Sequence, residues 1–312
     1  MPDADGPAPG SHGGPPASVA LVVNPSAAKG GALTVLPRVT GRLRDAGHAV
    51  EVLLSRSPAE AGELVTAAAA SGADVLAVLG GDGMAHLGLN AVARRAADDP
   101  TTAPALGLVP AGTGNDLARG LGLALDDLDA AVGAVVAGRT RPVDLLRVAD
   151  RWVGTVVATG FDALVNARAN RMAWPRGSAR YLLAVLAEVR TFRPLRYSLV
   201  VDGAERELDA MFVSVGNTTS FGGGLKICPR ADPYDGELDV TIIHPVSRAG
   251  LLRLLPQMKS GRFAADPCVE QLRARSVHVA HGAGTAYGDG EELGPTPVAV
   301  ELVPAAIRVC LP

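Results

Sequence analysis

The sequence predicts an N-terminal doubly wound α/β domain followed by an antiparallel β-sandwich-like domain, with a functional cleft between the two. Three observations support this prediction. Apolar runs alternate with helical patterns over residues 18–141. From residue 142 to residue 312, short β-like runs dominate and are separated by Gly, Pro and Asp turns. Polar, glycine-bearing loops follow three apolar runs of the first domain, and ligands of open α/β sheets bind at such strand ends.

In the first domain, strands and helices are expected to alternate. The run Val19–Val23 is continuously apolar, as in a parallel strand buried on both faces, and it ends at Asn24-Pro25. The expected strands are 19–23, 49–54, 75–79 and 105–109. The expected helices cover residues 33–43, 58–71 and 86–97, and a further helix follows Asn115.

The second domain is expected to consist mainly of strands. They are predicted at 143–148, 152–158, 197–201, 210–215, 237–243, 276–280 and 297–302. Helices are predicted around 181–191 and 248–260. The final run, Ile307–Cys310, is a candidate to return to the first domain.

The composition limits the class of protein. The 312 residues are 48% hydrophobic and 20% charged, which is sufficient for two folded domains. The net charge is −3 and aromatic residues make up 4%, which argues against a nucleic-acid partner. The three cysteines lie far apart, which predicts no disulfide framework and suits the cytoplasm. No run of 18 apolar residues and no signal sequence is found, and the Pro/Gly-rich residues 1–17 are expected to form a disordered tail.

The strongest local feature is Gly80-Gly81-Asp82-Gly83, which follows a buried strand and precedes a helix. Glycines let the backbone turn sharply and approach an anion closely. The N-terminus of the helix that follows favours negative charge. Asp82 would then lie among phosphates, where a carboxylate needs a cation or a role in proton transfer. The alternative is a tight turn in which Asp82 only caps the helix.

Two further loops have the same character. Pro110–Asp116 follows the strand 105–109, and Asn24–Gly30 follows the first strand; both contain glycine and polar side chains and precede a helix. Together with the first loop they predict a phosphate-binding cleft at one edge of the sheet. Neither a Walker A loop nor a dinucleotide-binding GxGxxG fingerprint is present. The alternative is that Asn115 or Asp116 merely caps a helix.

Two acidic turns stand out in the second domain. Residues 287–292 (YGDGEE) place carboxylates on a glycine-flanked turn. In residues 229–239 (PRADPYDGELD), Asp232 and Asp235 lie three apart and could share a hard cation with backbone carbonyls. For each of them a plain solvated turn is the alternative interpretation.

Six segments, taken in order, resemble the diacylglycerol kinase catalytic-domain family in its soluble bacterial lipid kinase branch. They are NPSAAKG (24–30), GGDGM (80–84), PAGTGNDLAR (110–119), GFDALV (160–165), GNTTSFGGGLKICPRADPYDGELDV (216–240) and DGE (289–291). The resemblance covers nearly the whole chain after residue 18. It implies an ATP-dependent kinase that phosphorylates a lipid hydroxyl in the interdomain cleft, with diacylglycerol as the expected substrate and phosphatidic acid as the product.

The resemblance also implies roles for single residues. Glu291 matches the general base, and Asp82 and Asp116 match acidic positions that organise catalytic Mg²⁺ and water. Asp232, Asp235 and the backbone carbonyl of Glu237 match a second, structural Mg²⁺ site. The residues that match the nucleotide-binding positions are Asn24, Pro25, Ser26, Ala27, Ala28, Ser55, Gly80, Gly81, Asp82, Gly83, Met84, Gly112, Thr113 and Asn115.

The sequence departs from the family after the GGDG loop. Met84 stands where the family usually has Thr, and His86-Leu87 stands where it has Asn-Glu. Side-chain ligation of the nucleotide by these residues is therefore in doubt, whereas backbone contacts do not depend on the side chain. These departures keep open a catalytically impaired nucleotide-sensing protein as an alternative, beside a kinase for a sphingoid base, another lipid or a soluble nucleotide.

The lipid substrate implies a membrane surface as partner. Between Arg168 and Arg196 there are seven arginines and a single acid, Glu188, with Met172 and Trp174 among them. A basic stretch with an aromatic residue suits anionic headgroups, and a solvated helical face is the alternative. The protein is expected in the cytoplasm, peripheral on the inner face of the membrane. A homodimer is compatible with the sequence, which leaves the oligomeric state open.

Overall fold

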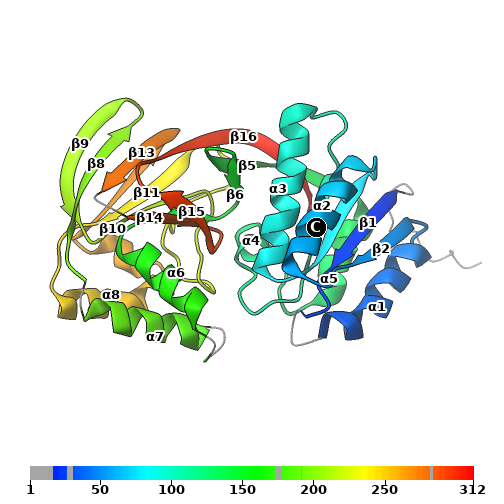
Figure 1. Ribbon diagram of the computed structural model, residues 1–312, viewed down its shortest axis with the longest axis horizontal. Coiled ribbons are helices and arrows are strands. Elements are labelled where there is room, and N and C mark those ends of the chain that lie inside the picture. The colour runs from blue at the N-terminus through cyan, green and yellow to red at the C-terminus, as the bar shows by residue number, and fades with distance from the viewer. Residues whose placement is uncertain (1–16, 27–30, 173, 175–177, 191, 282–283) are drawn as a thin grey trace, which may run out of the picture.

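The computed structural model of the chain describes residues 17–26, 31–172, 174, 178–190, 192–281 and 284–312. Two lobes are joined by strands that run between them (Figure 1). The strands of the first lobe are β1 (Ser18–Val23), β2 (Ala49–Leu54), β3 (Val75–Gly80) and β4 (Ala105–Pro110). Its helices are α1 (Gly31–Asp45), α2 (Pro58–Ala70), α3 (Asp82–Asp98), α4 (Asp116–Gly120) and α5 (Leu128–Ala137).

The first lobe is a parallel sheet in the order β2-β1-β3-β4. Its strands are apolar throughout because both faces are covered. In β1, Leu21 faces a core with α1 and α5, whereas Val22 faces a core with α2 and α3. Helices on both faces define a doubly wound α/β domain and bring the carboxyl ends of β1, β3 and β4 to one edge.

The second lobe contains two sheets. Its strands are β5 (Thr140–Val148), β6 (Arg151–Val153), β7 (Val156–Ala158), β8 (Leu195–Val201), β9 (Ala204–Ala210), β10 (Phe212–Gly216), β11 (Leu238–Ile243), β12 (Val269–Ala274), β13 (Ser276–His281), β14 (Thr285–Gly288), β15 (Glu291–Pro295) and β16 (Val298–Cys310). The six-stranded sheet β12-β11-β10-β7-β14-β15 packs against strands β8, β13 and β16 through one apolar core. This confirms the predicted antiparallel, sandwich-like second domain.

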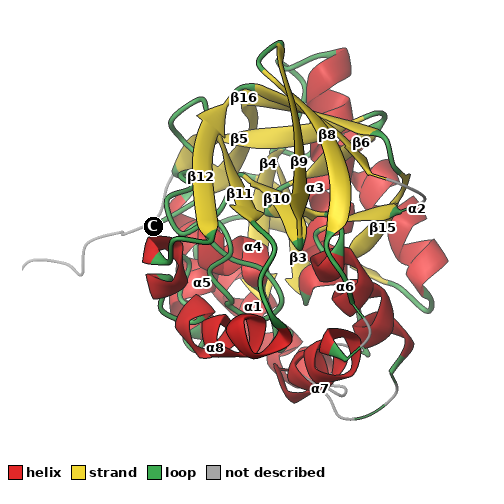
Figure 2. Cartoon of the chain, turned by 90° about the vertical axis from the view of Figure 1, so that its left-hand side faces the viewer, coloured by secondary structure: helices red, strands yellow, loops and turns green. Residues whose placement is uncertain are grey.

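Three helices cover the outer face of the six-stranded sheet: α6 (Phe161–Arg171), α7 (Ser178–Val189) and α8 (Arg248–Met258), the last followed by a short 3-10 turn at Arg262–Ala265. In Figure 2 they lie along the lower edge of the lobe that faces the viewer. Their apolar sides pack on Phe212 and Ile243 of the sheet.

The long strand β16 couples the lobes. Its first half pairs with β13, and Val309 in its second half pairs in parallel with Leu106 of β4. It also pairs with β5, the strand by which the chain leaves the first lobe. One continuous sheet therefore passes through both lobes, and the C-terminus lies in the first (Figure 1).

Several predicted boundaries were wrong for physical reasons. Helix α3 begins at Asp82 rather than His86, because the glycine loop turns directly into it. The run 152–158 is divided between β6 and β7, which lie in different sheets. Helix α6 was missed because its residues Phe161–Arg171 form a weak amphipathic pattern, and the polar strand β9 was missed because it carries four charges and lies at a sheet edge.

Candidate functional site

The two glycine loops of the first domain touch through their backbones. A methyl group on Gly112 would lie 2.5 Å from the Cα atom of Gly81, and one on Gly80 would lie 2.5 Å from Met84 Cγ. A methyl group on Gly114 would clash with the Asp82 carboxylate. Only glycine fits at these positions, so the glycines bring the ends of β3 and β4 together.

Asp82 joins the loops electrostatically. Its Oδ1 accepts a hydrogen bond from the Asp116 amide at 2.6 Å, and its Oδ2 accepts one from the Asn115 amide at 3.0 Å. Asn115 adopts a left-handed conformation (φ 53°), and its side chain exchanges two hydrogen bonds with the backbone of Gly112. The Asp82 side chain thus takes up the free amides that begin α4 instead of capping its own helix.

Asp116 reaches from the first domain to the second. Its carboxylate accepts hydrogen bonds from the amides of Gly223 and Gly224, at 2.8 and 2.9 Å. Burial and the nearby charge of Asp82 raise the pKa of Asp116, although the two amide hydrogen bonds and Arg119 oppose this. A buried carboxylate whose pKa is raised, such as that of Asp116, gains free energy when a cation binds beside it.

The acidic turn between β14 and β15 is also fixed by hydrogen bonds, which its residue Asp289 accepts. Asp289 accepts hydrogen bonds from the Gly154 amide and from the amide and hydroxyl of Thr155, at 2.6–3.0 Å. His86 of α3 contacts the same carboxylate at 3.1 Å. Burial alone would raise the pKa of Asp289, but these hydrogen bonds and the charge of His86 lower it. Asp289 therefore anchors the turn that presents Glu291.

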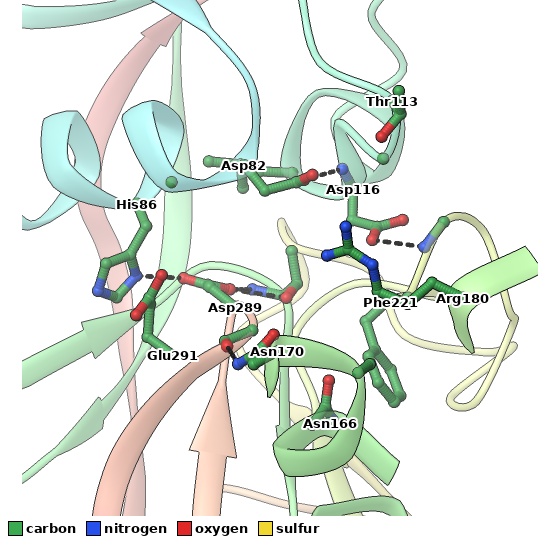
Figure 3. Close-up of a pocket in the computed structure, with 18 residues that line it drawn as sticks. Asp82, His86, Thr113, Asp116, Asn166, Asn170, Arg180, Phe221, Asp289 and Glu291 are labelled. Atoms are coloured by element: carbon green, nitrogen blue, oxygen red, sulfur yellow. Dashed lines mark hydrogen bonds and ion pairs between the residues drawn. The ribbon is translucent and has the colours of Figure 1, made fainter. Parts of the chain in front are cut away.

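These elements surround one cavity of about 260 Å³ between the domains. In Figure 3, Asp82, Thr113 and Asp116 lie on one side of the cavity, and Asp289, Glu291 and Asn170 lie on the other. Asn170 of α6 donates a hydrogen bond to the Gly290 carbonyl, so the second domain also supports the Glu291 turn from below. Carboxylates from both domains thus share one solvent-accessible space.

The structure brings together part of the predicted site. Asp82, Gly83, Thr113, Asp116 and Glu291 line the cavity. The other described residues predicted to bind the nucleotide do not line this cavity. Except for Met84, which is in α3, they lie at or just beyond the carboxyl ends of the parallel strands: Asn24, Pro25, Ser26, Ser55, Gly80, Gly81, Gly112 and Asn115. Ala27 and Ala28 lie outside the described residues.

Two of the residues predicted to bind the nucleotide have structural roles instead of lining the cavity. Ser55 is buried, and its hydroxyl donates to the Val23 carbonyl at 3.1 Å, which joins β1 and β2. Met84 is 3% exposed and packs into the core over Gly80. The thioether of Met84 therefore faces the protein, so the loss of a threonine hydroxyl at this position removes no polar group from the cavity.

Several cavity residues were not predicted from the sequence. They are Thr155, Asn166, Asn170, Arg180, Phe221, Gly222 and Gly223. His86 and Asp289 also line the cavity and stand in segments that the sequence analysis singled out, but neither was given a role of its own. Two signals could have found some of them: the glycine run Phe221–Gly224, and the position of Asp289 two residues before Glu291. Asn166 and Asn170 carried no sequence signal, because they depend on helix α6.

The predicted structural magnesium residues lie away from this cavity, in the turn between β10 and β11. Asp232 and Asp235 each accept a hydrogen bond from a backbone amide of their own turn. The guanidinium of Arg273 forms ion pairs with Asp235 and Glu237. Among the described residues, no group of three or more His, Cys, Asp or Glu side chains is arranged to hold a metal ion.

Asp82 and Asp116 suit a different kind of magnesium site, in which the ion is bound together with a substrate. Mg²⁺ prefers oxygen ligands and commonly keeps several waters while it binds one or two carboxylates together with substrate phosphates. The two carboxylates are close, oriented by backbone amides and open to the cavity. The donor set therefore fits Mg²⁺ bound together with a nucleotide.

Comparison with known proteins agrees with this geometry. The sequence model "Diacylglycerol kinase catalytic domain" matches residues 18–148, and "YegS C-terminal NAD kinase beta sandwich-like domain" matches residues 155–311. A diacylglycerol kinase of Mycobacterium tuberculosis is 42% identical over 300 residues, which are 94% of this chain and 95% of the relative. A protein of Stenotrophomonas maltophilia named "Probable lipid kinase YegS-like" is 30% identical over 287 residues, which are 87% of this chain and 90% of the relative.

A solved structure shares the fold. The crystal structure of a diacylglycerol kinase from Bacillus anthracis superposes with a TM-score of 0.75 at 24% identity, covering 95% of this chain and 97% of that one. The two domains and the carboxylate-lined cavity between them thus define a phosphotransferase of the lipid kinase class. Within that class, the chain belongs to the diacylglycerol kinase catalytic-domain family. The resemblance and the enzyme class predicted from the sequence are both confirmed.

Proposed function

We propose that the protein transfers the γ-phosphoryl group of ATP to the free hydroxyl of diacylglycerol. The observation that carries the proposal is that Asp82 of the first domain and Glu291 of the second line the same cavity. A phosphate donor bound at the glycine loops and an alcohol bound at the second domain would meet there. The substrate itself is suggested by the 42% identical diacylglycerol kinase.

The chemistry of phosphoryl transfer requires positioning and charge neutralisation more than covalent catalysis. Helix α3 begins at Asp82 with Gly81 as its N-cap, and no side chain that the structure describes caps it, so the amides of its first turn would bind phosphate oxygens. Asp82 and Asp116 would hold Mg²⁺, which offsets phosphate charge when it is bound. Glu291 would accept the proton of the lipid hydroxyl, since it is exposed to the cavity and lies next to the anchored Asp289.

The direct test is a phosphorylation assay with a panel of lipids and radiolabelled ATP, run with and without Mg²⁺. Diacylglycerol should be phosphorylated to phosphatidic acid in the presence of Mg²⁺, and a sphingoid base should not. Preferred labelling of a sphingoid base or of a soluble nucleotide would contradict the proposed substrate.

We also propose that α6 and α7 dock the enzyme on the cytoplasmic face of an anionic membrane. In the part of the chain that the structure describes, no helix is long and apolar enough to cross a bilayer. Trp174 is 79% exposed, and the exposed leucines of this region are Leu164, Leu182, Leu183 and Leu186. Arg168 and Arg171 are on α6, and Arg190 and Arg193 follow α7, whereas Arg176 falls outside the described residues. Arg168 forms an ion pair with Glu188. Exposed apolar side chains flanked by arginines suit an anionic lipid surface.

Sedimentation with anionic vesicles at low salt tests the docking surface. The double substitution Leu182→Ser/Leu186→Ser should reduce vesicle binding several-fold, because each leucine contributes apolar area to the interface. Leu252→Ser, which changes a leucine of α8 that is 39% exposed, is the matched control. Equal binding of all variants, or no binding by the wild type, would contradict docking through α7.

A further inference from the structure

The turn that was expected to hold a structural metal ion instead contacts an arginine. Arg273 lies on β12 directly opposite Asp239 on β11, so the pairing of the two strands fixes where its side chain begins. Its guanidinium forms an ion pair with Asp235, contacts Glu237 at 2.8 Å and approaches Asp239 to 3.8 Å. One cationic group thus meets three carboxylates, two of them on the turn and one on the adjacent strand.

Asp239 makes the cationic partner necessary. Its side chain is 1% exposed, and neither carboxylate oxygen has a hydrogen-bond partner among the described residues. A buried carboxylate without hydrogen bonds is costly unless a cation lies close to it, and Arg273 supplies that charge.

The same contacts leave little room for a metal ion. Asp232 and Asp235 each use one oxygen to accept an amide hydrogen bond, and the other oxygen of Asp235 contacts Arg273. Mg²⁺ would need carboxylate oxygens at about 2.0–2.1 Å in an octahedral arrangement. It would therefore have to displace the guanidinium from Asp235, which leaves the buried charge of Asp239 less well compensated.

The turn lies where the two domains join. The Asp144 amide on β5 donates to the Pro233 carbonyl at 2.9 Å, and its carboxylate accepts from the amides of Gly236 and, on β16, Ala305. Arg141 of β5 stacks on the ring of Tyr234, 3.3 Å from its centroid. The turn is thus bound to β5, and Asp144 of β5 also binds β16, the other strand that connects the lobes.

We propose that in this chain the Arg273 guanidinium takes the place of the structural cation, so that the junction between the domains holds without a bound metal. The resemblance had assigned Mg²⁺ to Asp232, Asp235 and the Glu237 carbonyl. The inference concerns the metal use of the proposed kinase, in which Mg²⁺ would be needed only at Asp82 and Asp116. The test measures the thermal stability of the protein without nucleotide or lipid. A failure of this inference can therefore be distinguished from a failure of the proposed activity.

The test compares thermal unfolding in EDTA and in millimolar MgCl₂ or CaCl₂. It is carried out in an Asp82→Asn background, so that Mg²⁺ at the cavity contributes little. The parent protein should melt at the same temperature in both conditions. A structural site saturated by the metal would instead raise the melting temperature by several degrees, and that result would overturn the proposal.

Arg273→Ala should make the thermal stability of the protein depend on a metal ion bound at the turn. The variant should melt at a lower temperature in EDTA and recover when Mg²⁺ or Ca²⁺ is added, because the carboxylates have lost their cation. The matched control is Arg275→Ala, an exposed arginine just beyond the end of β12, which should show neither effect. An Arg273→Ala variant that behaves like this control would overturn the proposal.

Metal content keeps the proposal testable should Arg273→Ala fail to fold. The Asp82→Asn protein, in which Mg²⁺ at the cavity contributes little, should contain less than one equivalent of Mg²⁺ or Ca²⁺ by elemental analysis when it is purified without chelator. Arg273→Lys, which keeps the charge but not the forked geometry, should fold with intermediate stability. A full equivalent of metal in the Asp82→Asn protein would contradict the inference.

Discussion

The surroundings of Asp289 and Asp116 shift the pKa values of these two carboxylates in opposite directions. Asp289 receives three hydrogen bonds from the β6–β7 segment and a contact from His86, so its charged form is favoured. Asp116 is buried beside Asp82, so its charged form is disfavoured unless a cation is present. Asp289 therefore stabilises the fold of its turn, whereas the protonation of Asp116 depends on whether a cation is bound in the cavity.

The lowered pKa of Asp289 predicts how its contribution to stability depends on pH. A carboxyl group with a depressed folded-state pKa stabilises the protein above its unfolded pKa of about 3.9 and loses this effect as pH falls through its lower folded value. Asp289→Asn should therefore lower the free energy of unfolding by about 2 kcal/mol, and the difference from wild type should be constant between pH 5 and 8.

Urea unfolding at several pH values measures this difference. Glu292→Gln, which changes the neighbouring acid on β15, provides the control for a charge change at the same turn. A difference between wild type and Asp289→Asn that shrinks steadily from pH 8 to pH 5 would show that the Asp289 pKa is not depressed.

At the scale of elements, the site depends on how closely two strand-to-helix loops approach each other. The β3–α3 loop and the β4–α4 loop meet at Gly81 and Gly112, where there is no space for a side chain. The Asp82 carboxylate joins the two loops by accepting a hydrogen bond from the Asn115 amide, and the Asn115 side chain holds its own loop by accepting one from the Gly112 amide. The position of the carboxylates in the cavity is thus a consequence of loop packing.

Gly112→Ala should therefore destabilise the protein by about 1–3 kcal/mol, because overpacking forces the two loops apart. Binding of a fluorescent ATP analogue should weaken at the same time. Gly133→Ala is the matched control: this glycine lies inside α5 with nothing within 4 Å of the added methyl group. The control should stabilise the protein by about 0.5–1 kcal/mol, and an equal effect of the two substitutions would contradict loop contact.

The elements also show what could be predicted from the sequence. The strands β1, β3 and β4 were predictable because burial on both faces leaves a continuous apolar run, and the glycine loops because few residues permit such turns. Helix α6 and strand β9 were not predictable from the sequence, because their conformation depends on contacts with segments far away in the sequence. Asn166 and Asn170 of α6 therefore entered the site only with the structure.

At the scale of the whole molecule, the chain crosses between domains twice and the site is assembled from both. β5 leaves the first domain, and β16 returns to pair with β4. Asp116 with Gly223–Gly224, and His86 with Asp289, are side-chain links across the cleft. The domain order was predictable from composition, and the candidate return of Ile307–Cys310 to the first domain is confirmed by its pairing with β4. The strand order of the continuous sheet was not predictable, because pairing of distant strands leaves no local trace in the sequence.

The central claim is that an acid from the second domain acts on a phosphate donor held by the first. The most direct measurement is the rate of diacylglycerol phosphorylation by Glu291→Gln and by Glu292→Gln, with the fold of each variant checked by circular dichroism. Glu292 hydrogen-bonds Tyr287 and lines a different cavity, so its loss should leave the rate within a few-fold of wild type. Glu291→Gln should lose at least about a hundredfold in kcat, as expected for a general base. A folded Glu291→Gln enzyme with a near wild-type rate would contradict the account.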